Sequence, residues 1–151
     1  MTQDAVLAYL HLAAILSWVV FISSTAALAR NEWLNAAVVN RLVVVDRIAF
    51  IAGGVVLATG LARWALGAKG SAWYAQQPLL WFKLVLFVAM AAMALRTRRE
   101  LRSWQRQLHL AGALPPPDAV VALRRRVMRA SHLMLVLPAA AVLLARGIWT
   151  I

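Results

Sequence analysis

The chain has 151 residues, of which 64% are hydrophobic, and it carries a formal net charge of +11 at pH 7. Its mean hydropathy is +0.76, and because soluble domains are nearer half apolar, this composition argues against an ordinary soluble protein. Cysteine is absent, which excludes disulfides, thiolate metal sites and cysteine nucleophiles. The length indicates a single domain over residues 1–151.

Four long apolar blocks, at about 5–29, 42–66, 79–95 and 130–149, each approach the roughly 20 residues that a helix needs to cross a bilayer. The blocks are apolar on all faces, whereas helices of a soluble bundle carry a narrower apolar stripe. The sequence therefore predicts an all-α fold, a bundle of four transmembrane helices.

The basic residues are concentrated on one side of the predicted membrane. Of the 16 Lys and Arg residues, the following 12 lie at or between block ends that share a side: Arg30, Arg41, Arg47, Arg96, Arg98, Arg99, Arg102, Arg106, Arg124, Arg125, Arg126 and Arg129. Such an excess is typical of the cytoplasmic side. It predicts a bacterial inner (cytoplasmic) membrane protein with a basic cytoplasmic loop at about 96–129 and both termini on the outer, periplasmic side. Charge of this origin argues against nucleic acid as a partner.

The long loop itself is expected to be partly helical. Pro78 suits the first turn of the third helix, which is predicted to continue past the membrane toward Leu110 until the prolines at 115–117 end it. Asp118 can then cap the next helix, because a carboxylate accepts hydrogen bonds from the free N–H groups of a first turn. That helix is predicted to run to about Ala145.

Each of the four predicted helices carries one basic or imidazole group in the outer half of the membrane. From a rise of about 1.5 Å per residue, these groups lie roughly 6–10 Å from the outer helix ends; they are His11, Arg63, Lys83 and Arg146. Any one of the cations could extend its charge to the outer headgroups. Four such groups at one level favour a shared site, which would attract an anionic partner such as a propionate, a phosphate, a quinone oxygen or a lipid headgroup.

Two further polar residues lie in the predicted inner half. His132 either hydrogen-bonds a neighbouring helix or helps to bind a cofactor, but it would lie about 15 Å from His11 along the membrane normal. That separation is too large for both to ligate one haem in one subunit. Asp46, the only acid within a predicted span, is expected to pair with an arginine of the basic loop, with a proton-handling role as the alternative.

The chain contains the segments RLVVVDRIAFIAGG and TGLARWALGAKGSAWYAQQPLLWFK, then W-x-R, a proline-containing loop and a final LPAAAVLLARG. Together these segments resemble a family of small four-helix bacterial membrane proteins of unknown function, over nearly the whole chain. The resemblance implies the fold but no activity. The recurring positions of that family match Asp46, Gly60, Arg63, Lys69, Gly70, Tyr74, Pro78, Lys83, Arg146 and Gly147.

Two shorter motifs, LHLAAILSW at 10–18 and WFKL at 81–84, resemble the haem-binding membrane protoporphyrinogen oxidase family of four-helix proteins. The resemblance puts His11 in the place of that family's first-helix histidine and Lys83 in the place of its third-helix lysine. A histidine that precedes the lysine in that family is replaced by Phe82 here. The resemblance therefore implies cofactor binding more than oxidase activity.

The leading hypothesis is a membrane protein that binds an anionic, largely apolar cofactor, b-type haem first, with a redox or electron-transfer role. His11 would be the axial ligand of the haem iron, because neutral imidazole suits iron, and Arg63, Lys83 or Arg146 would hold the propionates. No glycine-rich phosphate loop, zinc-protease motif or nucleophilic serine motif occurs in the sequence. No catalytic residue is therefore assigned.

Two alternatives stay open. The first is a non-enzymatic accessory or assembly subunit of a larger membrane complex. Ala49 and Gly53, two small residues spaced by four, favour close helix packing, and with the basic loop they could dock a partner or anionic lipid. The second is a small transporter, which would require a homo-oligomer because four helices with one acid offer little for ion coupling.

Overall fold

The computed structural model describes residues 2–67 and 70–145, without the side chains of residues 2, 135 and 137–145. The described elements are α1 (Thr2–Leu28), η1 (Asn31–Trp33), α2 (Ala36–Leu66), α3 (Ser71–Ala75), α4 (Pro78–Ala111) and α5 (Pro117–Ala145). All of them are helical, and no strand occurs among the described residues. The predicted all-α class is confirmed.

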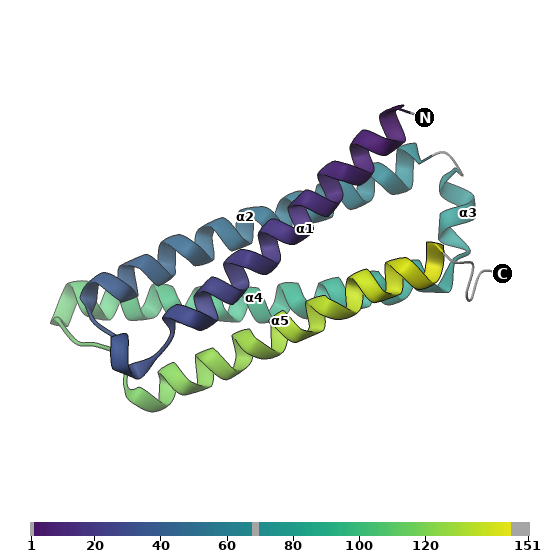
Figure 1. Ribbon diagram of the computed structural model, residues 1–151. Helices are drawn as coiled ribbons and strands as arrows, with labels where there is room; N and C mark the ends of the chain where they lie inside the picture. The colour runs from purple at the N-terminus through teal and green to yellow at the C-terminus, as the bar shows by residue number, and fades with distance from the viewer. Residues whose placement is uncertain (1, 68–69, 146–151) are drawn as a thin grey trace.

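The four long helices form an elongated bundle (Figure 1). α1 packs on α2, α2 on α4, α4 on α5 and α5 back on α1, so the long helices close into a ring. One end of the bundle holds η1 and the connection between α4 and α5, and we call it the basic end because the arginine-rich segments lie there. The other end holds the N-terminus and α3, and we call it the α3 end (Figure 1).

Three of these helices are long and apolar enough to cross a membrane: Gln3–Leu28, Ala36–Leu66 and Pro78–Ala111. This finding rests on length and composition within the described residues. The first half of α5 carries arginines, and most side chains of its second half lie outside the described part. The fourth span and the orientation of the termini therefore stay predictions.

α2 begins well before the apolar block at 42–66, because a polar cap starts it. The side chain of Asn35 accepts a hydrogen bond from the backbone N–H of Val38 at 2.9 Å, which satisfies one of the free donors of the first turn. Ala36 is consequently the first helical residue.

α4 begins with Pro78 at its first turn, as predicted, and continues to Ala111. Its end is made by Gly112, which adopts a left-handed conformation with φ of 63°. The N–H of Gly112 donates to the carbonyl of Leu108 at 3.0 Å, a geometry that glycine reaches without a Cβ penalty. The helix thus stops before the prolines at 115–117 rather than at them.

The region predicted as a basic loop at about 96–129 is mostly helical. α4 and α5 both extend beyond their apolar runs, and residues 112–116 connect them. Asp118 is the second residue of α5, inside the first turn and not at the cap position predicted for it, and a negative charge there interacts favourably with the helix dipole. α5 continues to Ala145, as predicted.

The contact predicted at Ala49 and Gly53 is confirmed, and it lies within the chain. Both residues are buried, and a Cβ placed on Gly53 would lie 3.0 Å from the ring of Trp18 on α1. Trp18 is 2% exposed and also contacts Phe87 of α4, with ring centroids 5.5 Å apart. Because Trp18 covers the Ala49–Gly53 face of α2, this face is not free to dock another protein. One argument for the accessory-subunit alternative is thereby removed.

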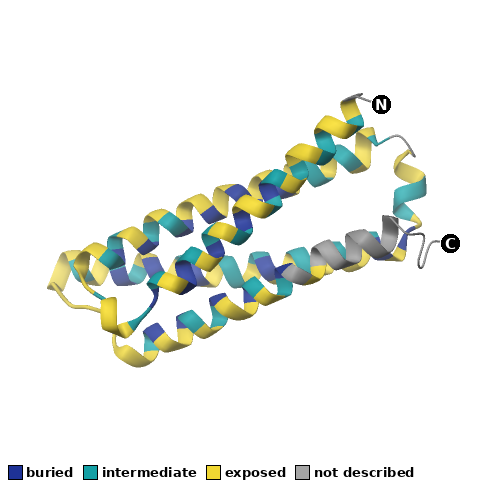
Figure 2. Ribbon diagram, viewed as in Figure 1, coloured by how far each residue is buried: buried dark blue, intermediate teal, exposed yellow. Residues whose placement is uncertain are grey.

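Buried residues gather in the middle of the bundle and toward the basic end (Figure 2). Toward the α3 end, no described residue of α1 before Ala14 is buried, none of α2 after Val56, and none of α4 between Leu79 and Met90. The α1–α2 pair and the α4–α5 pair also diverge toward this end (Figure 1). The predicted cationic site falls in this half, where the described parts of α1, α2 and α4 bury few residues.

Candidate functional site

The site begins with a contact between α1 and α2 in the half near the α3 end. Nδ1 of His11 lies 2.8 Å from the hydroxyl oxygen of Thr59. That hydroxyl also lies 2.7 Å from the carbonyl oxygen of Val55 and 3.2 Å from that of Val56, and it can donate its one hydrogen to the nearer of them. When it does so, Thr59 accepts a hydrogen bond from Nδ1–H of His11, and this tautomer of His11 keeps a free lone pair on Nε2.

Gly60 allows the imidazole to lie this close to α2. A Cβ placed on Gly60 would lie 3.3 Å from Cε1 of His11, closer than an ordinary contact. A larger residue would displace the ring from Thr59. Thr59 and Gly60 together therefore define where the imidazole sits.

Two cations join this contact from different helices. Arg63 follows Thr59 by one turn on the same face of α2, and Lys83 comes from α4; both side chains are half-buried. Both charges lie within electrostatic range of His11, and Arg63 lies within range of Lys83. The structure thus places three of the four predicted residues within electrostatic range of His11 or of one another, whereas Arg146 lies outside the described residues.

The cationic cluster, defined as His11, Arg63 and Lys83, has no carboxylate of its own. Across the described chain, no acidic side chain lies within ion-pair distance of Arg63 or Lys83. Like charges in a half-buried setting repel one another more than they would in water. The cluster is therefore suited to a ligand that brings negative charge with it.

The cluster is not suited to a free metal ion. The described residues contain no group of three or more His, Cys, Asp or Glu side chains that could hold one. His11 is the only metal-ligating side chain of the cluster. Iron at this site would have to arrive inside an organic ligand such as a porphyrin.

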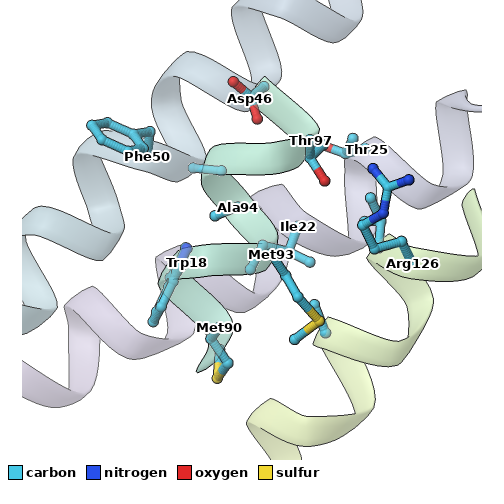
Figure 3. A pocket seen from close by; sticks show the side chains of 13 residues that line it. Trp18, Ile22, Thr25, Asp46, Phe50, Met90, Met93, Ala94, Thr97 and Arg126 are labelled. Carbon is cyan, nitrogen blue, oxygen red and sulfur yellow. The ribbon is translucent and has the colours of Figure 1, made fainter. Parts of the chain in front are cut away.

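A second polar feature lies nearer the middle of the bundle. A cavity of about 30 Å³ is lined by residues of α1, α2, α4 and α5, and Figure 3 shows their side chains. Its polar lining consists of Thr25, Asp46, Thr97 and Arg126. A water molecule needs roughly 10–15 Å³ of such space, so the cavity has room for water but not for an organic cofactor.

Both charged groups of this cavity have partners. Asp46 Oδ2 lies 3.7 Å from Nη1 of Arg98, whose guanidinium carbon lies 4.3 Å from the ring centroid of Phe50. Arg126 is 2.6 Å from Glu100. The prediction that Asp46 pairs with an arginine of the 96–129 region is confirmed. The two ion pairs connect α4 to α2 and to α5, which supports a structural role for Asp46.

His132 does not join the cationic cluster. It is exposed on α5, two residues beyond Ala130, which lines the same cavity as Asp46. Asp46 precedes Thr59, the partner of His11, by 13 residues of α2, which is roughly 20 Å of helix. Because His132 lies near the level of Asp46 and slightly closer to the α3 end, His132 and His11 are separated by about 15 Å along the bundle. Of these two histidines, His11 alone could therefore be an axial ligand in the cationic cluster.

Sequence reasoning missed Thr59. The signal available was a lone hydroxyl one turn before Arg63 in an apolar helix, next to a glycine. Because a threonine in a helix can satisfy its hydroxyl within its own backbone, this signal alone does not indicate a partner. Only the alignment of α1 against α2 shows that His11 is opposite it.

Comparison with known proteins gives one match. The family model described as Predicted membrane protein (DUF2214) matches residues 3–149, nearly the whole chain. No curated protein matches, and no solved structure matches. The resemblance to a family of small membrane proteins of unknown function is therefore shown, whereas the comparisons give no support to the resemblance to the haem-binding oxidase family.

Proposed function

This chain belongs to the DUF2214 family of predicted membrane proteins, and from that premise we propose that it binds an anionic, largely apolar cofactor in one half of its helix bundle. The proposal is supported by the placement of His11, Arg63 and Lys83, from three helices, within electrostatic range in one half of the bundle. b-type haem is the first candidate, because it combines an apolar macrocycle, two carboxylates and an iron atom that accepts an imidazole nitrogen.

The proposed topology puts the α3 end in the outer half of a bacterial inner membrane. Three candidate spans and the family description both indicate a membrane protein. The positive-inside rule assigns the basic end to the cytoplasm, with 12 of the 16 basic residues on that side. α5 is then the fourth span and both termini are periplasmic.

His11 is proposed to hold the iron through Nε2. The tautomer proposed for this role donates Nδ1–H to Thr59 and leaves the lone pair of Nε2 free. Histidines that ligate metals commonly donate their other ring N–H to a neighbouring group, which fixes the tautomer and the ring orientation. Haem, when bound, supplies one-electron redox chemistry at its iron.

Arg63 and Lys83 are proposed to hold the two propionates. Hydrogen bonds between a cationic donor and a carboxylate are roughly twice as strong as neutral ones, and they strengthen when the pair is withdrawn from water. Two carboxylates would also remove the repulsion between these two cations. Arg146 of the C-terminal segment is expected to contribute a third cation to the same site.

The proposal is tested by the visible spectrum of the protein purified from membranes in a mild detergent. The oxidised protein is expected to show a Soret band that shifts on reduction with dithionite. Organic extraction followed by mass spectrometry would identify the ligand independently of its colour. A protein that shows no Soret band, even when expressed with added haem precursor and then incubated with haem, would show that the haem assignment is wrong.

A further inference from the structure

A basic groove lies between α4 and α5 near the basic end, away from the cationic cluster. It has a volume of about 520 Å³. We call it the α4–α5 groove, and its lining residues are Ala92, Met93, Arg96, Ala122, Arg125, Arg126 and Arg129. Its wall thus combines four guanidinium groups with small or apolar side chains.

Most of this positive charge is uncompensated. Arg126 pairs with Glu100 at 2.6 Å, which holds one guanidinium in place. Within the described chain, no carboxylate lies within ion-pair distance of Arg96, Arg125 or Arg129, and all three are exposed. Arg125 and Arg129 are one turn apart, so both point from the same face of α5. The groove can therefore present several guanidinium groups to one anion.

The α4–α5 groove also lies where the apolar runs of α4 and α5 meet their arginine-rich segments. Arg96 directly follows the run that ends at Leu95, and Arg129 directly precedes the run that begins at Ala130. Ala92, one turn before Arg96 on α4, belongs to the apolar part. The groove therefore has an apolar portion at hydrocarbon depth and a basic portion at the membrane surface.

We propose that the α4–α5 groove binds an anionic phospholipid of the leaflet at the basic end, with its phosphate among Arg96, Arg125 and Arg129. Guanidinium groups match phosphate oxygens in pairs of parallel hydrogen bonds, and basic pockets between membrane helices on the cytoplasmic side bind such headgroups. An acyl chain would lie along Ala92 and Met93. The inference does not depend on any cofactor at the cationic cluster.

The test is native mass spectrometry of the full chain in detergent, titrated with phosphatidylglycerol or with zwitterionic phosphatidylcholine. Wild type is expected to retain phosphatidylglycerol in preference to phosphatidylcholine. The double variant Arg125→Gln/Arg129→Gln should bind phosphatidylglycerol roughly 30-fold more weakly. This factor assumes a loss of ~1 kcal/mol of binding free energy per arginine, and about 1.4 kcal/mol corresponds to a tenfold change in affinity. Inorganic phosphate at the same concentration should not displace the lipid, because it lacks the acyl chains.

The matched control is Arg102→Gln/Arg106→Gln, which removes the same charge from exposed positions of α4 outside the groove. It should retain nearly the affinity of wild type. Equal losses in the two double variants, or no loss in the groove variant, would overturn the proposal. The single variant Arg125→Gln, with helicity checked by circular dichroism, keeps the test valid if the double variant misfolds. Its expected loss is roughly fivefold.

Discussion

Three glycines of α2 provide a graded test of how closely α1 packs against it. Replacing each by alanine adds the same methyl group and the same gain in helix propensity, roughly 0.8–1 kcal/mol. The surroundings differ. A Cβ at Gly54 would meet no atom within 4 Å, one at Gly60 would lie 3.3 Å from His11, and one at Gly53 would lie 3.0 Å from Trp18.

These contacts convert into a predicted order of stability. Gly54→Ala keeps the full gain of about 1 kcal/mol. Gly60→Ala moves the imidazole and weakens its bond to Thr59, a loss of about 0.5–1.5 kcal/mol, so it should be close to neutral. Gly53→Ala presses on a buried tryptophan ring, and overpacking typically costs about 1–3 kcal/mol. The net effect at Gly53 is a loss of roughly 1 kcal/mol, so the first and last variants should differ by about 2 kcal/mol.

The assay is thermal unfolding of the three variants and wild type in one detergent, followed by tryptophan fluorescence and circular dichroism. Gly54→Ala should have the highest midpoint and Gly53→Ala the lowest, with wild type and Gly60→Ala between them. If Gly53→Ala proved as stable as Gly54→Ala, the packing of α1 on α2 described above would be wrong.

Three further substitutions test the polar groups. Asp46→Asn should lower the free energy of unfolding by about 2 kcal/mol, because it leaves Arg98 without its carboxylate. Denaturant unfolding measures this loss, and the double variant Asp46→Asn/Arg98→Met should recover part of the lost stability. Thr59→Val removes the acceptor for the His11 N–H and should weaken haem binding roughly tenfold, measured by haem titration; unchanged affinity would contradict the tautomer assignment. Lys83→Met removes a like charge from the cationic cluster, so it should stabilise the cofactor-free protein by about 1 kcal/mol and at the same time weaken haem binding. If the thermal midpoint of the cofactor-free protein and its affinity for haem both rose or both fell, that result would count against an anion-binding cluster.

Hydropathy and charge were sufficient to predict the main helices, because a run of about 20 apolar residues has few alternatives to a membrane helix. The extension of α4 past its apolar run and the first turn at Pro78 also followed from local signals. The pairing of Asp46 with an arginine followed from the high cost of burying an unpaired charge, and the partner is Arg98.

Other features needed the structure because they depend on which helix faces meet. A period of 3.6 residues defines the faces of a helix but not their partners. The contacts of Thr59 with His11 and of Gly53 with Trp18 therefore emerge only when α1 is aligned with α2. The early start of α2 at Ala36 could not be predicted for another reason, because its cap, Asn35, lies outside the apolar block that marks the span.

The most direct test of the central claim is a haem titration of the cofactor-depleted protein, in which wild type is compared with His11→Ala and with His132→Ala as the matched histidine control. Wild type and His132→Ala are predicted to bind one haem per chain, with the Soret band of imidazole-ligated iron. His11→Ala is predicted to lose that band while retaining its helicity. An unchanged band in His11→Ala, or its loss in His132→Ala instead, would contradict the proposed site.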